Sequence, residues 1–252
     1  MVLEDIHNLH ANKLCFIAGS SPSLRHINYE TIKPYVVITV NSAILKYPNC
    51  NYFVTDDQGV HTWNYWYDTA RNSKCIKLLF KDKLDKHVDG FNHDEIIFYQ
   101  HRFYKQYSDN QAEYDRQTLR MFADPKTPII GARSSLASAI NLAVIMGCDP
   151  IVTIGMDNSY EGNKRYYWQF DGEKKATEIN NRIFSVPNKG KINNLPIDNH
   201  CFDYMEYWQR FAAVNSDFLR GRIINASVNS LIEIFPKRDL HSILQEHGGR
   251  YV

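Results

Sequence analysis

The stretch Leu14-Cys15-Phe16-Ile17-Ala18-Gly19-Ser20-Ser21-Pro22-Ser23-Leu24 decides the fold class. Its apolar first half predicts a buried strand, and Gly19 with the hydroxyl residues after it predicts a tight turn. Pro22 is well placed as a first helical residue. In the order strand, turn, helix, the helix N-terminus meets the turn and favours an anion such as a phosphate. The dinucleotide and P-loop glycine patterns are missing, so an ordinary strand-to-helix turn is the simpler interpretation of this stretch alone.

Small polar or acidic residues follow each of the first three predicted strands. Residues 35–40 and 52–55 are rich in β-branched and aromatic side chains, which favours strands. Because the carboxyl ends of parallel strands meet at one edge of a sheet, the residues after them are expected to gather there. These residues are Ser20, Ser21, Asn41, Asp56 and Asp57. Each of them could instead cap a helix or form a turn, so the repetition carries the inference.

The rest of the chain continues the same alternation of strands and helices. Further strands are predicted at residues 75–80, 95–99, 151–157 and 221–226, and helices near residues 23–32, 43–47, 136–146, 204–214 and 228–234. Residues 103–124 have no clear period and suggest a loop with helical pieces. The pattern predicts an α/β, Rossmann-like fold with a mostly parallel sheet flanked by helices. We expect a nucleotide-binding domain from residues 1–156 and 199–252, with residues 157–198 inserted as a lid over the site.

A second anion site is suggested by Arg133-Ser134-Ser135, which precedes the buried helix predicted at residues 136–146. A cation and two hydroxyls at a helix N-terminus suit a phosphate or carboxylate. A capped core helix with Arg133 in a structural ion pair explains the pattern equally well. The strand that follows this helix ends at Asp157.

Composition narrows the classes of function. The chain has 252 residues, a net charge of +1, 44% hydrophobic and 23% charged residues, which fits a globular protein and argues against stable nucleic-acid binding. Five scattered cysteines suggest neither a zinc site nor disulfides, and we expect reduced, buried thiols. With no leader or spanning segment in the sequence, a cytoplasmic location is expected, and peripheral membrane association stays open.

Taken in order, these motifs resemble the bacterial sialyltransferases of glycosyltransferase family 42, the Campylobacter-type enzymes. The wider group includes motility accessory factor glycosyltransferases and 6-hydroxymethylpterin diphosphokinase-like proteins. The family's opening Ile-Ala-Gly-Asn-Gly-Pro-Ser-Leu is similar to residues 17–24, and its Ser-Gly-Ile-Asp strand end is similar to residues 154–157. Its Pro-Asn-Ser-Leu near the C-terminus is similar to residues 228–231. The likeness spans most of the chain as separate motifs.

The resemblance implies roles for particular residues. Tyr160 and Tyr166 have the six-residue spacing of the family's lid tyrosines, which hydrogen-bond the departing phosphate, and His200 has the position of its general base. Nucleotide and donor would be held by Gly19, Ser20, Ser21, Asn41, Asp56, Arg133, Ser134, Ser135 and Asp157. The implied reaction moves a sugar, sialic acid or a related nonulosonic acid, from a CMP-activated donor to a glycan or other hydroxyl acceptor, without a metal. The family also suggests a homo-oligomer.

Two departures keep other functions open. Ser20-Ser21 replaces Asn-Gly, and Asp56 replaces an Asn, which adds a negative charge where an anionic sugar donor would lie. One alternative is a diphosphokinase in which Asp56, Asp57 and Asp157 hold Mg²⁺ and ATP. A second alternative is a nucleotide-binding module without turnover.

Overall fold

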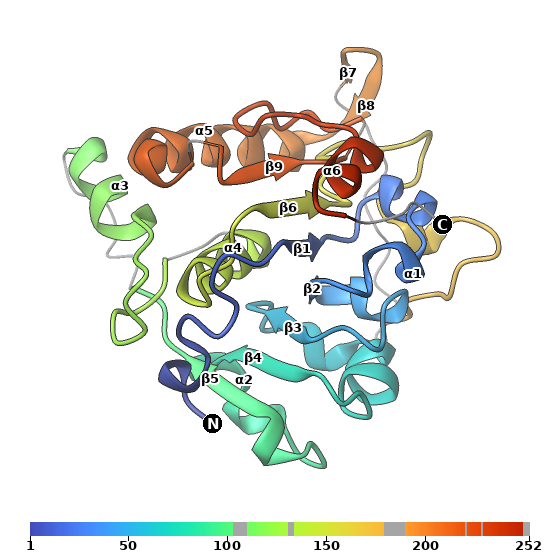
Figure 1. The fold of residues 1–252 in the computed structure, drawn as a ribbon. Coiled ribbons are helices and arrows are strands. Elements are labelled where there is room, and N and C mark those ends of the chain that lie inside the picture. Colours follow the sequence, from blue (N-terminus) through green and yellow to red (C-terminus); the bar gives the residue numbers. More distant parts are fainter. Residues whose placement is uncertain (103–109, 131–133, 179–189, 220, 228, 249–252) are drawn as a thin grey trace.

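A seven-stranded parallel sheet forms the centre of the computed structural model (Figure 1). The structure describes residues 1–102, 110–130, 134–178, 190–219, 221–227 and 229–248. The strands are β1 (Cys15–Ala18), β2 (Val36–Val40), β3 (Tyr52–Thr55), β4 (Ile76–Phe80), β5 (Ile96–Tyr99), β6 (Ile151–Ile154) and β9 (Ile223–Asn225). They lie in the order β5-β4-β3-β2-β1-β6-β9, with all neighbours parallel. The chain therefore builds outward from β1 and then returns to its other side, which confirms the Rossmann-like α/β class.

Helices cover both faces of this sheet (Figure 1). On one face, α4 (Ser135–Ile145) and α5 (Asn199–Leu219) pack over strand residues such as Ile17 and Ile38. On the other face, α1 (Tyr29–Ile32) and α6 (Leu240–Glu246) pack over the alternate residues, such as Phe16. Because successive strand residues point to opposite faces, strands buried on both sides must be apolar throughout. That requirement explains the continuous apolar runs in the sequence.

The shorter elements mostly connect the strands of the sheet along the chain. They include α2 (Lys81–Leu84), α3 (Gln111–Leu119) and a separate antiparallel hairpin of β7 (Gly190–Ile192) and β8 (Leu195–Ile197). Short 3-10 turns occupy Leu3–Ile6, Pro22–His26, Asn41–Leu45, Val60–Thr62, Asp85–His87, His93–Glu95 and Tyr167–Gln169, and a π turn occupies Trp66–Ala70.

The strands are confirmed as elements, whereas some helices differ from the prediction. The helix expected at residues 23–32 is broken at Asn28, whose side chain accepts a hydrogen bond from the Glu30 N–H and starts α1 afresh. The helix expected at residues 228–234 is wrong for the described residues 229–234. There the Ser230 hydroxyl donates to the Met156 carbonyl and accepts from the Ile232 N–H, and these bonds hold a turn. The helices α2, α3 and α6 and the β7–β8 hairpin have bounds that the sequence pattern did not mark.

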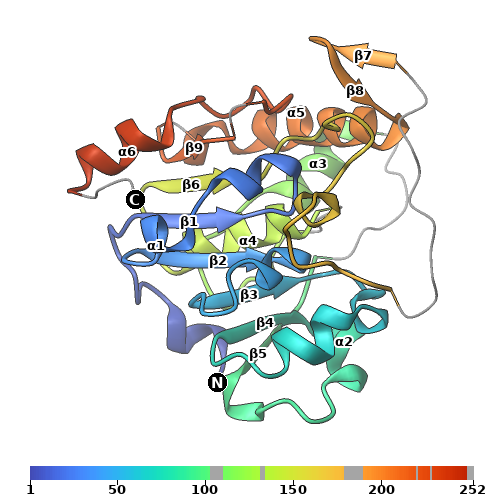
Figure 2. The same cartoon turned by 90° about the vertical axis from the view of Figure 1, so that its right-hand side faces the viewer.

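The carboxyl ends of the parallel strands point to one side of the molecule, the right of Figure 2. The described parts of the expected lid, residues 157–178 and 190–198, lie at that side. Their division from the rest of the chain as a separate lid stays a prediction.

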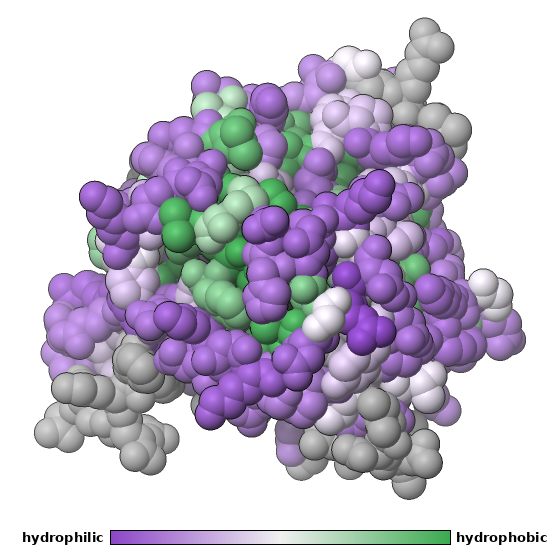
Figure 3. Space-filling model, turned by 90° about the horizontal axis from the view of Figure 1, so that it is seen from below, coloured by the Kyte–Doolittle hydropathy of each residue, from purple (hydrophilic) through white to green (hydrophobic). Residues whose placement is uncertain are grey.

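Figure 3 views the molecule from below, toward the β5 edge of the sheet. Hydrophilic side chains there surround a hydrophobic area, and the N-terminal turn Leu3–Ile6 packs beside β5. Within the part of the chain that the structure describes, no helix has the length and apolar character needed to cross a membrane.

Candidate active site

Two glycines set the floor of the site, where β1 and β6 lie side by side. Gly155 follows β6 with φ of 62°, and a Cβ there would lie 2.6 Å from the Gly19 carbonyl oxygen. A Cβ at Gly19 would in turn lie 2.4 Å from the Gly155 carbonyl oxygen. The Ser21 N–H donates to that same oxygen at 3.1 Å. The turn after β1 can therefore lie flat against β6, at the point where the sheet order reverses and ligands bind in such folds.

A cavity of about 580 Å³ opens above this pair, at the carboxyl ends of β1, β2, β3 and β6. The sequence-predicted residues on its wall are Gly19, Ser20, Ser21, Asn41, Asp56, Ser134, Ser135, Tyr166 and His200. Tyr160 and Asp157 are not among the lining residues. The predicted Arg133 lies outside the described residues. Sequence reasoning therefore located much of the cavity, although several of its side chains are engaged in ways that it did not foresee.

Ser20 belongs to a hydroxyl network that ties two loops together. Its hydroxyl donates to the Val40 carbonyl at 3.2 Å and accepts from Ser42 at 2.9 Å. The Trp168 indole N–H donates to Ser42 Oγ at 3.1 Å, and Tyr167 donates to the Ser42 carbonyl at 2.8 Å. Hydrogen bonds from Tyr167 and Trp168 thus connect this aromatic segment to the turns after β1 and β2.

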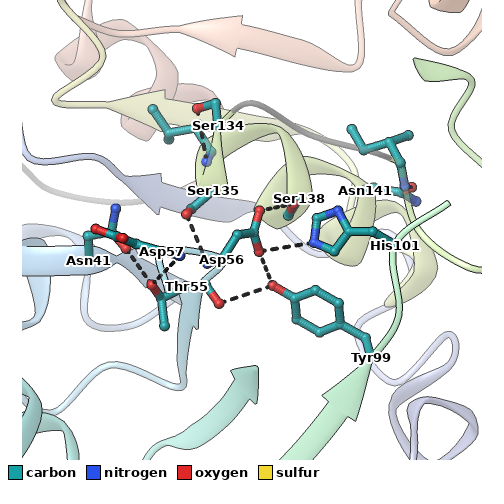
Figure 4. Close-up of polar contacts among 12 residues, drawn as sticks. Asn41, Thr55, Asp56, Asp57, Tyr99, His101, Ser134, Ser135, Ser138 and Asn141 are labelled. Carbon is teal, nitrogen blue, oxygen red and sulfur yellow. Dashed lines mark hydrogen bonds and ion pairs between the residues drawn. The ribbon is translucent and has the colours of Figure 1, made fainter. Parts of the chain in front are cut away.

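Asn41 occupies a strained position directly after β2. Its φ is 51°, in the left-handed region that asparagine tolerates better than most residues. Its Oδ1 accepts from the Thr55 hydroxyl at 2.7 Å (Figure 4). The side-chain amide N–H groups of Asn41 are left without a hydrogen bond to any described residue and can donate to a ligand.

Asp56 is held by donors from two other elements, β5 and α4 (Figure 4). Tyr99 donates to one carboxylate oxygen, from which His101 Nε2 is 3.4 Å away, and Ser138 of α4 donates to the other oxygen at 2.5 Å. The Asp56 N–H donates to Ser135 Oγ at 3.0 Å. A ligand would therefore have to displace a protein donor to engage this carboxylate fully, while the Ser135 hydroxyl keeps its proton to donate.

Asp157 lies outside the cavity lining, and its side chain is buried. It accepts from the Ser23 N–H at 2.8 Å and from the Ser23 hydroxyl at 2.5 Å. Burial raises the pKa of the Asp157 carboxyl to about 6, although the Ser23 hydrogen bonds act against the rise. This carboxyl anchors the turn that carries Ser20 and Ser21.

Asp198 organises the opposite wall of the cavity. It immediately precedes α5, and its Oδ1 accepts from the Cys201 N–H at 2.9 Å, as a helix N-cap does. Its Oδ2 accepts from the Tyr160 hydroxyl at 2.8 Å and lies 3.7 Å from Arg165 Nη1. Burial acts to raise the pKa of Asp198, but these hydrogen bonds hold it below the usual value. The helix thereby begins with a fixed first turn.

His200 lies in that first turn and faces the cavity. Its ring packs edge-on against Tyr204, with 4.4 Å between ring centroids. Partial burial of the ring and the Arg165 charge lower the pKa of His200 below its ordinary value. A neutral imidazole at the edge of a cavity can accept a proton from a ligand hydroxyl.

The two tyrosines of the predicted pair have different surroundings. Tyr166 lines the cavity and stacks on Trp168, with 5.2 Å between centroids and 8° between planes. Tyr160 is 1% exposed and directs its hydroxyl to Asp198. Only Tyr166 of the pair lies on the cavity wall.

Sequence reasoning missed several wall residues, above all Arg165 and Ser42. The signal for Arg165 is its place directly before Tyr166-Tyr167-Trp168, where a cation opens an aromatic segment. For Asp198 the sequence offers only its place two residues before His200. Its organising role depends on contacts with side chains far away in the sequence.

Fold and cavity together define a Rossmann-like α/β protein with a cavity at the carboxyl edge of its sheet. A glycosyltransferase shares this fold: the solved structure of the MAf glycosyltransferase from Magnetospirillum magneticum AMB-1 is similar, with a TM-score of 0.53 and 12% identity. The match covers 94% of this chain and 37% of that chain, so this chain corresponds to little more than a third of its neighbour. No family model matches the sequence, and no curated protein matches it. At this identity the likeness shows a glycosyltransferase-like fold.

Proposed function

We propose that this protein is a glycosyltransferase that uses a CMP-activated donor. It would move a sugar, sialic acid or a related nonulosonic acid, to a hydroxyl of a glycan or another acceptor. The observation that carries the proposal is a His200 ring with a lowered pKa, set on the cavity wall where the sheet order reverses. The glycosyltransferase-like fold and the family resemblance of the motifs support it.

In this proposal His200 is the general base. Its unprotonated nitrogen takes the proton of the acceptor hydroxyl while that oxygen attacks the anomeric carbon of the donor. The bond from the anomeric carbon to the phosphate oxygen breaks, and CMP leaves with the bonding electrons. An imidazole that is neutral near pH 7 suits this step because it is ready to receive the proton.

The remaining wall residues would bind the donor. Ser21 and the Asn41 amide would hold the nucleotide, together with the hydroxyls of Ser134 and Ser135 at the N-terminus of α4. Tyr166 would donate to the phosphate as negative charge develops on it. We assign Tyr160 a positioning role through Asp198, and the role of Arg133 stays a prediction.

The diphosphokinase alternative requires three carboxylates to share a magnesium ion. Asp56 and Asp157 already accept hydrogen bonds from protein donors on both carboxylate oxygens. Within the described part of the chain, no group of three His, Cys, Asp or Glu side chains is arranged to hold a metal. These contacts count against a site in which all three carboxylates hold one magnesium ion, and the panel below tests a site that uses fewer carboxylates with the ATP phosphates.

A thermal-shift panel tests the donor class with CMP, CDP, UDP, GDP, ATP and their sugars, each with and without Mg²⁺. A ligand at one hundred times its Kd stabilises the folded state by about 2.7 kcal/mol, which is a shift of roughly 5–10 °C for a chain of this size. We expect CMP and CMP-sialic acid to give this shift in EDTA. A shift only with ATP and Mg²⁺ would instead support the diphosphokinase, and binding without turnover would support the non-catalytic module.

A further inference from the structure

Arg165 is a largely buried cation on the cavity wall. Its side chain is 24% exposed, and its backbone N–H is fixed by Gln169 Oε1 at 2.6 Å. Its guanidinium donates no hydrogen bond to any residue in the described part of the chain. A guanidinium has five N–H donors, and Arg165 lies on the cavity wall, where a bound ligand can reach its side chain. A ligand in the cavity can therefore supply acceptors that the described part of the chain does not.

The nearest carboxylate cannot serve as that acceptor in the observed arrangement. Asp198 Oδ2 lies 3.7 Å from Arg165 Nη1, beyond hydrogen-bond distance, and accepts from Tyr160 instead. Its Oδ1 is used by the Cys201 N–H of the α5 cap. Asp198 therefore offers Arg165 an attractive charge without a hydrogen bond.

Aromatic rings hold the guanidinium in place. Its carbon lies 6.0 Å from the Tyr160 ring centroid and 5.6 Å from that of Tyr166. Such cation–π contacts stabilise a charge without using its N–H groups. The planar fork is thus oriented in advance, and its donors stay available to the cavity.

We propose that Arg165 is the anion-binding residue of the cavity and donates two hydrogen bonds to one oxyanion of the ligand. The acceptor is a phosphate or a carboxylate, the two groups whose paired oxygens match a guanidinium fork. This inference rests on the proposed function in one respect: it places the anion on the sugar-nucleotide donor. Arg165 thereby selects for charged donors over neutral ones.

Titration calorimetry on the full chain tests this proposal with CMP, cytidine, free N-acetylneuraminic acid and inorganic pyrophosphate. The variants are Arg165→Gln, Arg165→Lys and, as the matched control, Lys83→Gln, which removes an exposed cation from the same cavity. We expect Arg165→Gln to weaken CMP about 10- to 100-fold and to leave cytidine unchanged. Arg165→Lys keeps the positive charge but not the paired N–H donors of the guanidinium, so it should lose less CMP affinity than Arg165→Gln. Lys83→Gln should change CMP affinity less than about threefold.

The two anion sources give different results. If Arg165→Gln loses affinity only for CMP and pyrophosphate, the anion that Arg165 binds is the phosphate. If it loses affinity only for N-acetylneuraminic acid, the anion is the carboxylate. Anion affinities that are unchanged in a folded Arg165→Gln variant would overturn the proposal. So would an equal loss in Lys83→Gln, or a wild type that binds none of these anions. Because the assay measures binding alone, a wild type that binds CMP through Arg165 but never transfers a sugar would refute only the proposed function.

Discussion

At the scale of single residues, the buried carboxyl of Asp157 makes stability depend on pH. Its folded pKa of about 6 lies above the ordinary value of 3.8, so the folded state binds this proton more tightly than the unfolded state. The resulting stabilisation is fully present below about pH 4 and is lost as the pH rises through about 6. The difference between the folded and unfolded pKa values corresponds to roughly 3 kcal/mol.

Asp157→Asn removes this dependence while keeping an acceptor for Ser23. We expect the unfolding free energy of wild type minus that of Asp157→Asn to fall by about 2–3 kcal/mol between pH 4 and pH 7. Urea unfolding at several pH values measures it. If the difference in unfolding free energy stays constant over this pH range, the pKa of Asp157 is not raised by folding.

His200 provides a second prediction, because the charge of Arg165 helps to lower its pKa. Removing that charge in Arg165→Gln should raise the His200 pKa, since Asp198 and Asp203 then act without an opposing cation. NMR titration of the imidazole C–H signals, assigned with His200→Ala, measures the shift. Lys83→Gln serves as the control and should leave this pKa nearly unchanged. A pKa that stays the same or falls in Arg165→Gln would contradict the expected coupling.

Sequence reasoning reached some of these residues and missed others for a physical reason. Asn41 could be found because it directly follows a predicted strand, and His200 is proposed because its position resembles that of the family's general base. The local signal for Arg165, a cation directly before an aromatic segment, does not show its surroundings. Its proposed role rests on the hydrogen bonds that its guanidinium does not make, and Asp198 makes its own hydrogen bonds to Tyr160 and to the start of α5.

At the scale of secondary structure elements, the approach of β1 to β6 depends on Gly19 and Gly155. Gly155→Ala should destabilise the fold by more than about 2 kcal/mol, because it combines a positive φ with a backbone clash. Gly162→Ala is the matched control, since Gly162 has a φ of 59° and a Cβ added there would meet nothing within 4 Å. It should cost only about 1 kcal/mol. Denaturant unfolding of both variants compares them, and equal losses would mean that the close approach contributes nothing.

The elements also differ in how far sequence could predict them. Buried parallel strands such as β2 (Val36–Val40) need continuous β-branched residues, so their pattern is strong. The short turns around β1 depend on local side-chain hydrogen bonds, such as the Asn28 cap, and their pattern is weak. The β7–β8 hairpin did leave a signal in Asn193-Asn194, where both residues have positive φ, as a tight hairpin turn requires.

At the scale of the whole molecule, the strand order explains where the site lies. The chain builds β1 to β5 in one direction and places β6 and β9 on the other side, so the strand order reverses between β1 and β6, and the cavity opens at the carboxyl ends of the strands around this point. The polar residues after successive strands predicted the edge of the sheet at which the cavity lies, but they did not predict the strand order. Homo-oligomer formation, a cytoplasmic location and independence from metals stay predictions.

The central claim is that His200 removes a proton during sugar transfer from a CMP-activated donor. The most direct measurement is the rate of CMP release from CMP-N-acetylneuraminic acid in EDTA, with an oligosaccharide mixture as acceptor. The comparison includes wild type, His200→Ala and, as a control, His247→Ala in an exposed position at the end of α6. We predict that wild type and His247→Ala release CMP at similar rates, and that His200→Ala is slower by roughly 10²- to 10⁴-fold with CMP binding retained. A His200→Ala variant as fast as wild type, or a wild type active only with ATP and Mg²⁺, would contradict the claim.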